Sequence, residues 1–194
     1  VLITRAENKA IENLEKLLAR RKGQSDEPDL LYRLAELQMR RSKSGRFFEI
    51  HQDSKTLKWS SFPVRIEKGA DSIRKAIKIY SRIQKDFPKF SEMDFVMFNR
   101  AFGHQQINEV TQAISLYEEM IKKFPKSSVV PDAHLAAGEL FYDQQKFANS
   151  LTHFMEIEKY PTSRVFNYGL YKAAWAHYNL KQNDEAIDAL LVVL

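Results

Sequence analysis

Side chains that could perform catalysis or hold a metal are sparse in this sequence. The 194 residues include no Cys and five His, namely His51, His104, His134, His153 and His177. His104 and His177 take positions where a helical hairpin packs an aromatic ring, and the others are far apart along the chain, so we assign the histidines to packing. The sequence contains no His-Glu-x-x-His zinc motif, no glycine-rich phosphate loop and no Gly-x-Ser-x-Gly nucleophile elbow. We therefore predict no catalytic residue, no metal site, no cofactor and no enzyme activity.

Basic and aromatic side chains occur together in one segment, residues 40–68, and could bind an anionic partner. The segment has eight Lys or Arg and three Asp or Glu, a net charge of +5 that equals the charge of the whole chain. The candidate contact residues are Arg46, Phe47, Phe48, Lys55, Lys58 and Trp59. In a docking arm for an acidic protein or an anionic surface, the rings would be anchors and the cations would steer the approach. In a solvated extension, the rings would pack between the segment's own two helices. Both interpretations remain open.

The composition is that of an ordinary folded protein rich in helix. With 44% hydrophobic and 28% charged residues the chain can bury a core, and its 6 Gly and 6 Pro are too few for the many tight turns of an all-β fold. Outside the basic segment the charges sum to zero and no nucleic-acid-binding module is recognisable, so we expect no nucleic-acid partner. No apolar run approaches the ~20 residues that span a bilayer. The chain begins with Val1 rather than Met, so we expect the true N-terminus, with any targeting signal, to lie outside this sequence.

A repeat of 36 or 37 residues organises the second half of the chain. Its markers are a proline, a small residue thirteen positions later, and a second small residue twelve positions after the first. The prolines are Pro88, Pro125 and Pro161, the first small residues are Ala101, Gly138 and Ala174, and the second are Ala113, Ser150 and Ala186. Apolar residues recur twice per unit with a helical period, which predicts a pair of helices. Small residues let two helices approach closely, and a large residue four positions after the second small one, such as Phe154, fills the gap.

The same spacing, traced toward the N-terminus, predicts a single helical array with no β-sheet and about nine or ten helices. Its predicted parts are an orphan second helix at 1–22, a repeat at 28–88 with an insertion at about 42–69, and repeats at 89–125, 126–161 and 162–194. The insertion is expected to lengthen the first helix of its repeat and to protrude as a long helical hairpin. Because both ends of the chain fall inside this pattern, we expect the sequence to be a fragment of a longer array.

The pattern resembles that of the tetratricopeptide repeat (TPR) proteins, W-x-x-L-G-x-x-Y followed by Ala, an aromatic residue and Pro. The third unit matches this pattern with Ala137, Gly138, Phe141, Ser150, Phe154 and Pro161. The Phe-Pro-Lys-Ser ending followed by Gly-x-x-Phe-Tyr is more particularly similar to repeats of bacterial envelope proteins of the YbgF and BamD kind. The units depart from the family pattern by running two or three residues beyond the usual length of about 34.

This resemblance implies a TPR superhelix, an α-solenoid of stacked antiparallel helical hairpins, whose concave wall is made by the first helix of each hairpin. The wall residues would be Phe95, Phe98, Phe102, Tyr142, Tyr168, Tyr171, Trp175 and Tyr178. Some of these rings could instead pack against the neighbouring repeat. Family members that grip a C-terminal carboxylate use Lys, Asn and Arg at such positions, so the rings here favour an apolar or aromatic peptide, or a partner's helix.

These features favour a non-catalytic scaffold that binds a protein partner, a peptide or a helix, in an aromatic groove. The resemblance to envelope proteins implies a place in a bacterial cell-envelope complex, in the periplasm or envelope, with the cytoplasm as the alternative location. Two other functions remain open, a structural spacer and an accessory domain of a larger protein whose activity lies elsewhere. The apolar run from Leu190 to Leu194 predicts that the chain self-associates or swaps its last helix unless downstream sequence is present.

Overall fold

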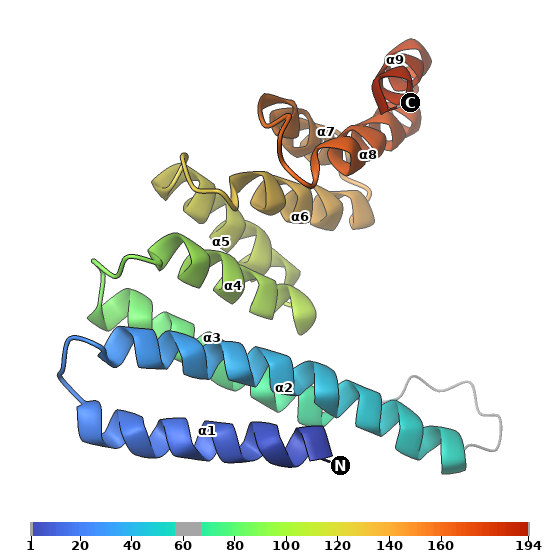
Figure 1. The fold of residues 1–194 in the computed structure, drawn as a ribbon. Coiled ribbons are helices and arrows are strands. Elements are labelled where there is room, and N and C mark those ends of the chain that lie inside the picture. The colour runs from blue at the N-terminus through green and yellow to red at the C-terminus, as the bar shows by residue number, and fades with distance from the viewer. Residues whose placement is uncertain (1, 57–66, 194) are drawn as a thin grey trace. The chain divides into compact units, whose positions relative to one another are not determined.

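In the computed structural model, helices account for every regular element of the described residues, which are 2–56 and 67–193 (Figure 1). Side chains are described for residues 6–42 and 69–192. Nine α-helices and one short 3-10 helix lie in this part of the chain, and no strand occurs there. The prediction of an all-α fold is therefore confirmed. The chain divides into two compact units, Val1–Glu109 and Val110–Leu194.

In the first unit, each helix packs against the next one along the chain. The helices are α1 (Leu2–Arg21), α2 (Glu27–Thr56), α3 (Glu67–Asp86) and α4 (Met93–Gln106). Figure 1 shows α1 and α3 lying along α2, which at 30 residues is longer than these two neighbours at 20 each. The extra length of α2 carries the first half of the expected insertion in helical form, through Thr56. Residues 57–66 lie outside the described residues.

The second unit is built in the same way, with helices that each contact the next in sequence. It comprises α5 (Val110–Lys123), α6 (Val130–Asp143), α7 (Phe147–Glu156), the 3-10 helix η1 (Ile157–Lys159), α8 (Phe166–Asn179) and α9 (Asn183–Val193). Figure 1 shows α6 with α7, and α8 with α9, as helical hairpins closed by short turns.

One tight turn recurs at the ends of α4, α6 and α8. Asn108, Gln145 and Lys181 adopt positive φ angles of 62°, 60° and 65° there. The amide of the next residue then bonds to the carbonyl five positions back, as Lys146 N does to Phe141 O at 3.0 Å. A left-handed residue ends a helix in this way because it turns the chain while satisfying a terminal carbonyl. The repeat spacing of the sequence therefore reappears in the backbone geometry.

Small and large residues of the repeat pack together inside the second unit. Phe154 of α7 is fully buried, and its ring lies against Gly138 of α6. Ser150, the second small residue of this hairpin, is also fully buried and donates its hydroxyl to the carbonyl of Phe147 at 2.9 Å. In the first unit the residue equivalent to Phe154 is Tyr80, which is 1% exposed. A buried ring thus occupies this repeat position in each unit, among core residues that are mostly aliphatic.

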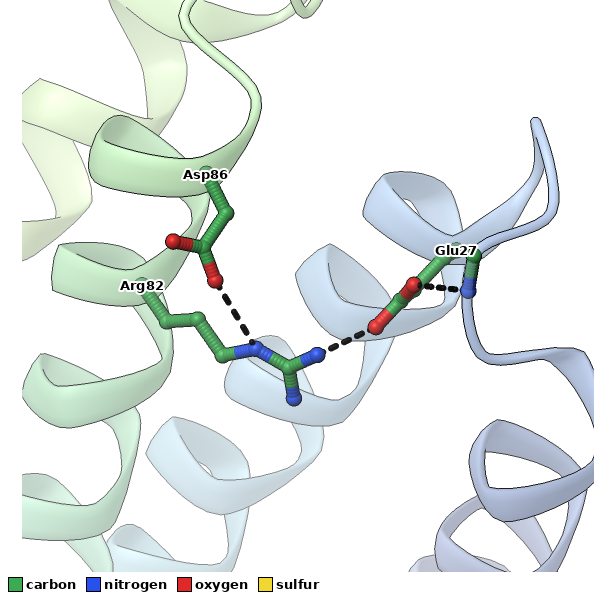
Figure 2. A network of polar contacts seen from close by, with 4 residues as sticks. Glu27, Arg82 and Asp86 are labelled. Atoms are coloured by element: carbon green, nitrogen blue, oxygen red, sulfur yellow. Dashed lines mark hydrogen bonds and ion pairs between the residues drawn. The ribbon is translucent and has the colours of Figure 1, made fainter.

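A buried carboxylate ties the α1–α2 turn to α3 in the first unit (Figure 2). The side chain of Glu27, at the start of α2, is 4% exposed. Its Oε2 accepts the backbone N–H of Gly23 at 2.6 Å, and its Oε1 accepts a charged hydrogen bond from Arg82 of α3. Nε of Arg82 in turn lies 3.4 Å from Oδ2 of Asp86. A carboxylate this deeply buried needs such partners because desolvation without compensation is costly.

Candidate partner-binding surface

Four aromatic side chains lie along one exposed face of α8, and we call them the α8 aromatic row. Tyr168, Tyr171, Trp175 and Tyr178 are 47%, 40%, 44% and 55% exposed. Their spacing of three and four residues places them on the same side of the helix. Neighbouring ring centroids are 6.3, 6.2 and 5.9 Å apart along the row, so the rings are in contact with one another. The row is therefore a continuous aromatic surface that solvent reaches.

A polar cluster on the α6 side holds the first ring of the row. Tyr168 donates its hydroxyl to Oε1 of Glu139 at 3.1 Å, and Nζ of Lys172 lies 3.5 Å from the same oxygen. Lys172 Nζ is also 5.1 Å from the ring centroid of Tyr142 and 5.7 Å from that of Tyr168. Partial burial, and then the Glu139 carboxylate, raises the pKa of Tyr168, so its phenol keeps its proton at neutral pH. The Glu139 and Lys172 charges cancel, which leaves this end of the row without net charge.

The other end of the row is held by an amide. Nδ2 of Asn179 lies 2.9 Å from the hydroxyl oxygen of Tyr142 and 2.7 Å from the carbonyl oxygen of Trp175. This side chain therefore connects the last turn of α8 to α6. A similar bond occurs in the first unit, where Asn99 of α4 donates to the hydroxyl of Tyr32 of α2 at 3.1 Å. Both bonds link helices that are second neighbours in the chain, α6 with α8 and α2 with α4. The bond in the second unit limits the rotation of α8 about its own axis.

A hollow of about 540 Å³ opens beside the row, between α8 and α9. The lining residues are almost entirely apolar: Tyr171, Ala174, Trp175 and Tyr178 from α8, and Asn183, Ala186, Ile187 and Leu190 from α9. On the α9 side Ile187 is 56% exposed and Leu190 is 40% exposed. Three of the four residues of the row therefore form one wall of an apolar hollow.

The hollow is the open copy of a surface that is covered elsewhere in the same unit. Moving its lining residues Tyr171, Tyr178, Ile187 and Leu190 back by one 36-residue repeat gives Leu135, Tyr142, Leu151 and Phe154. These equivalent residues pack in one apolar cluster with Ile157, and with Ala173 and Ala176 of α8. A Cβ added at Gly169 of α8 would lie 2.7 Å from Cδ1 of Ile157, so the covering face requires small residues. The unit itself thus shows what kind of element fits this surface, a helix with small residues on one face.

The other predicted wall residues have different surroundings. Phe95, Phe98 and Phe102 lie on α4 in the first unit, and each is partly buried. Tyr142 lies on α6 and is partly buried where α8 covers it. The structure therefore brings together four of the eight predicted wall residues as an exposed row, and α9 adds lining residues that the sequence interpretation did not include. Ile187 lies one repeat of 36 residues after Leu151, so the repeat spacing of the sequence could have identified the lining residues of α9.

The predicted docking arm lies where the structure describes little. Arg46, Phe47, Phe48 and Lys55 are within the helical span of α2, and their side chains are outside the described residues. Lys58 and Trp59 lie wholly outside the described residues. The choice between a docking arm and a solvated extension therefore stays a prediction from charge and composition.

Two histidines that are far apart in the sequence meet in the second unit. Nδ1 of His134 on α6 lies 3.1 Å from Nδ1 of His153 on α7. Spacing along the chain contains no signal for this contact. In the part of the chain that the structure describes, no group of three or more His, Cys, Asp or Glu residues could hold a metal ion. Among the described helices, none is long and apolar enough to cross a membrane.

Stacked antiparallel helical hairpins define an α-solenoid. A family model described as tetratricopeptide repeat matches residues 95–127 and 168–194. Among curated proteins, no significantly similar sequence was found.

Three solved structures are similar in fold. One is a single-substitution variant of the nearly identical TPR-like repeats assigned to a kinesin light chain of Podosopora anserina, with 12% identity and a TM-score of 0.60 over 98% of this chain and 89% of that chain. The form without that substitution is also 12% identical, with a TM-score of 0.58 over 98% and 90% of the two chains. BtubC (BKLC) from P. vanneervenii is 10% identical, with a TM-score of 0.55 over 98% and 87%. At these identities the likeness establishes the fold alone.

Proposed function

We propose that this chain is a non-catalytic scaffold whose second unit binds a helix of a partner protein over the α8 aromatic row and the α8–α9 hollow. The observation that carries the proposal is the α8 aromatic row, whose four contacting rings are 40% to 55% exposed beside the apolar hollow. The covering face of α8 consists of Gly169, Ala173 and Ala176, at successive spacings of four and three residues. A partner helix with small residues at this spacing would enter the hollow in the same way, while its larger apolar side chains contact the rings.

An extended apolar or aromatic peptide is the second form that the partner could take. The polar cluster beside the row has no net charge, and the hollow is lined by apolar atoms, so neither favours a strongly charged ligand. The rings of α4, which are Phe95, Phe98 and Phe102, are a further candidate contact surface of the first unit. Their partial burial favours a smaller role in binding than that of the α8 row.

We also propose that the chain works in a bacterial cell-envelope complex, in the periplasm or envelope. Support comes from the likeness of its Phe-Pro-Lys-Ser ending and following Gly-x-x-Phe-Tyr helix to repeats of the YbgF and BamD kind. The alternatives are a cytoplasmic location, and a role as a structural spacer or as an accessory domain of a larger protein. Cell fractionation followed by detection of the chain tests the location. A spacer would bind no partner through the α8 row.

The exposed face of α9 supports self-association as a property of this chain. Ile187, Leu191 and Val192 are 56%, 63% and 66% exposed, and Ile187 also lines the hollow. A second copy that covers this face would remove several large apolar side chains from water. We expect this contact to be weaker than binding of the true partner, because the face is narrow.

A photo-crosslinking amino acid placed at Trp175 tests the binding surface, with Met155 of α7 as the matched control position. Met155 is 46% exposed, close to the 44% of Trp175, and it does not line the hollow. We expect a partner protein to be captured from position 175 and not from 155, and Tyr171→Ala to weaken its binding. Equal capture from both positions, or affinity that Tyr171→Ala leaves unchanged, would show that the α8 row is not the binding surface.

A further inference from the structure

His134 and His153 form an enclosed pair between α6 and α7. His134 is 7% exposed and the side chain of His153 is 13% exposed. Their Nδ1 atoms are 3.1 Å apart, which is a hydrogen-bonding distance between two nitrogens. One of the two Nδ1 atoms must therefore carry a hydrogen and the other must offer its lone pair, because two N–H groups or two lone pairs at this distance would repel.

The charge of a neighbouring carboxylate favours one of the two rings as the donor. Oε1 of Glu118, on α5, lies 3.7 Å from Nε2 of His153. An ionised carboxylate only accepts, so it favours a hydrogen on Nε2 of His153. A neutral imidazole carries one N–H, which leaves Nδ1 of His153 as the acceptor. His134 then donates its Nδ1–H to His153, and Nε2 of His134 is the nitrogen that takes up the next proton.

We propose that this pair is an acid-sensitive hydrogen bond that links α6 to α7. The bond forms through one shared N–H at neutral pH, and it breaks when both rings carry a second proton. With both rings protonated, each Nδ1 has its own hydrogen, so the contact changes from an attractive hydrogen bond to two like charges in a poorly hydrated space. The first added proton is tolerated, because it enters at Nε2 of His134 and leaves the Nδ1–H donor in place. The two rings therefore titrate as one coupled system.

The charged groups around the pair favour its protonated form on balance, and burial outweighs them. Glu118 from α5 and Glu156 from α7 favour a charged ring, whereas Lys159 from η1 opposes charge on His134. Lys159 is itself paired with Glu156 at 2.7 Å, which weakens the effect of both on the rings. Phe141 of α6 stacks on His153 with a centroid distance of 5.5 Å and keeps water from that ring face.

The direction of the pH effect follows from the pKa values. Burial, and then the neighbouring His153, lowers the pKa of His134 to about 4, and burial lowers that of His153. In the unfolded chain an imidazole has a pKa of about 6.5. The unfolded chain therefore binds more protons below about pH 6.5, so the stability from the neutral pair is complete above that pH and is lost progressively as the pH falls toward about 4.

The pair acts on the layer that supports α8. Phe154 of α7 and Ile157 of η1 pack beneath Ala173 and Ala176 of α8. His153 is the residue next to Phe154, so movement of α7 away from α6 would move this support. Acid would thus loosen the packing of α7 and η1 beneath α8, without altering any residue of the α8 aromatic row itself.

Long-range ¹H–¹⁵N spectra of the histidine rings in the whole chain give the first test. At about pH 7.5 we expect His134 as the Nδ1–H tautomer and His153 as the Nε2–H tautomer. On acidification we expect the pair to take up two protons in separate steps, both below the ~6.5 of a free imidazole. Two Nε2–H tautomers, or independent titration near the ordinary value, would overturn the proposal.

Thermal unfolding of matched variants gives the second test. His153→Asn places an amide near the position of Nδ1 and cannot titrate, whereas His177→Asn removes a histidine that contacts Gln182 near the end of α8. Between about pH 7.5 and about pH 5, we expect the Tm of the wild type and of His177→Asn to fall by about 5 °C more than that of His153→Asn. An equal fall in all three proteins would overturn the proposal. So would a rise of the wild-type Tm on addition of Zn²⁺ that His153→Asn abolishes, because the pair would then be a metal site. If His153→Asn does not fold, the ring spectra of the wild type still decide.

Discussion

The Cα of Gly138 on α6 lies against the ring of Phe154 on α7, so closely that a Cβ built on Gly138 would be 2.5 Å from Cε1 of the ring. Phe154 is fully buried and cannot swing away. This contact joins the two markers of the repeat, a small residue on one helix and an aromatic residue on the next. It predicts that a side chain at position 138 overpacks the hairpin.

Gly138→Ala should therefore lower the free energy of unfolding by about 1–3 kcal/mol, because overpacking outweighs the gain in helix propensity of about 1 kcal/mol. Thermal or urea unfolding measures the change. Adding Phe154→Leu should recover part of the loss, because a smaller side chain relieves the same contact. A Gly138→Ala variant as stable as the wild type would contradict this packing.

A substitution in the α8 aromatic row should weaken partner binding more than it reduces the stability of the fold. Trp175→Ala should weaken partner binding by about 2 kcal/mol if Trp175 is an anchor of the interface. Trp175 is 44% exposed, so its removal leaves no closed cavity and should reduce stability by less than the 3–5 kcal/mol typical of a core aromatic. Binding and melting measured on this variant and on Met155→Ala test the prediction. A large loss of stability with unchanged affinity would assign Trp175 to repeat packing.

The Glu27–Arg82 contact predicts unequal effects for two arginines on α3. Arg82→Met leaves the Glu27 carboxylate buried without its charged partner and should cost about 2 kcal/mol of stability. Arg74→Met is the matched control, because Arg74 pairs with Asp71 in solvent, where both side chains are more than half exposed at 58% and 74%. It should change the stability by less than about 0.5 kcal/mol. Equal effects of the two substitutions in urea unfolding would show that the network of Figure 2 does not stabilise the first unit.

The apolar face of α9 predicts association that depends on concentration. Light scattering should show the average mass of the chain rising with protein concentration, and Leu191→Lys should suppress the rise by placing a charge on this face. Met155→Lys adds the same charge at an exposed apolar position on α7 and should leave the association unchanged. A strict monomer at high concentration would exclude self-association through α9.

The elements of this fold could be predicted from the sequence because their signals are local. Helical periodicity, the small residues and the prolines each act within one or two helices, and their spacing was sufficient for the all-α class and for the paired helices of the second unit. The common face of Tyr168, Tyr171, Trp175 and Tyr178 was equally predictable, since residues three and four apart on a helix share a side. The first half of the insertion appeared in the structure as the long extension of α2.

What covers each face was decided only by the tertiary structure. Tyr142 and Tyr178 are equivalent in the repeat, yet Tyr142 is partly buried under α8 whereas Tyr178 is 55% exposed beside an open hollow. The contact between His134 and His153 depends in the same way on how α6 and α7 pack. Periodicity determines which side chains share a face, because that is a property of one helix. It carries no information on which helix lies opposite, because the free energy of that contact depends on residues about one repeat away.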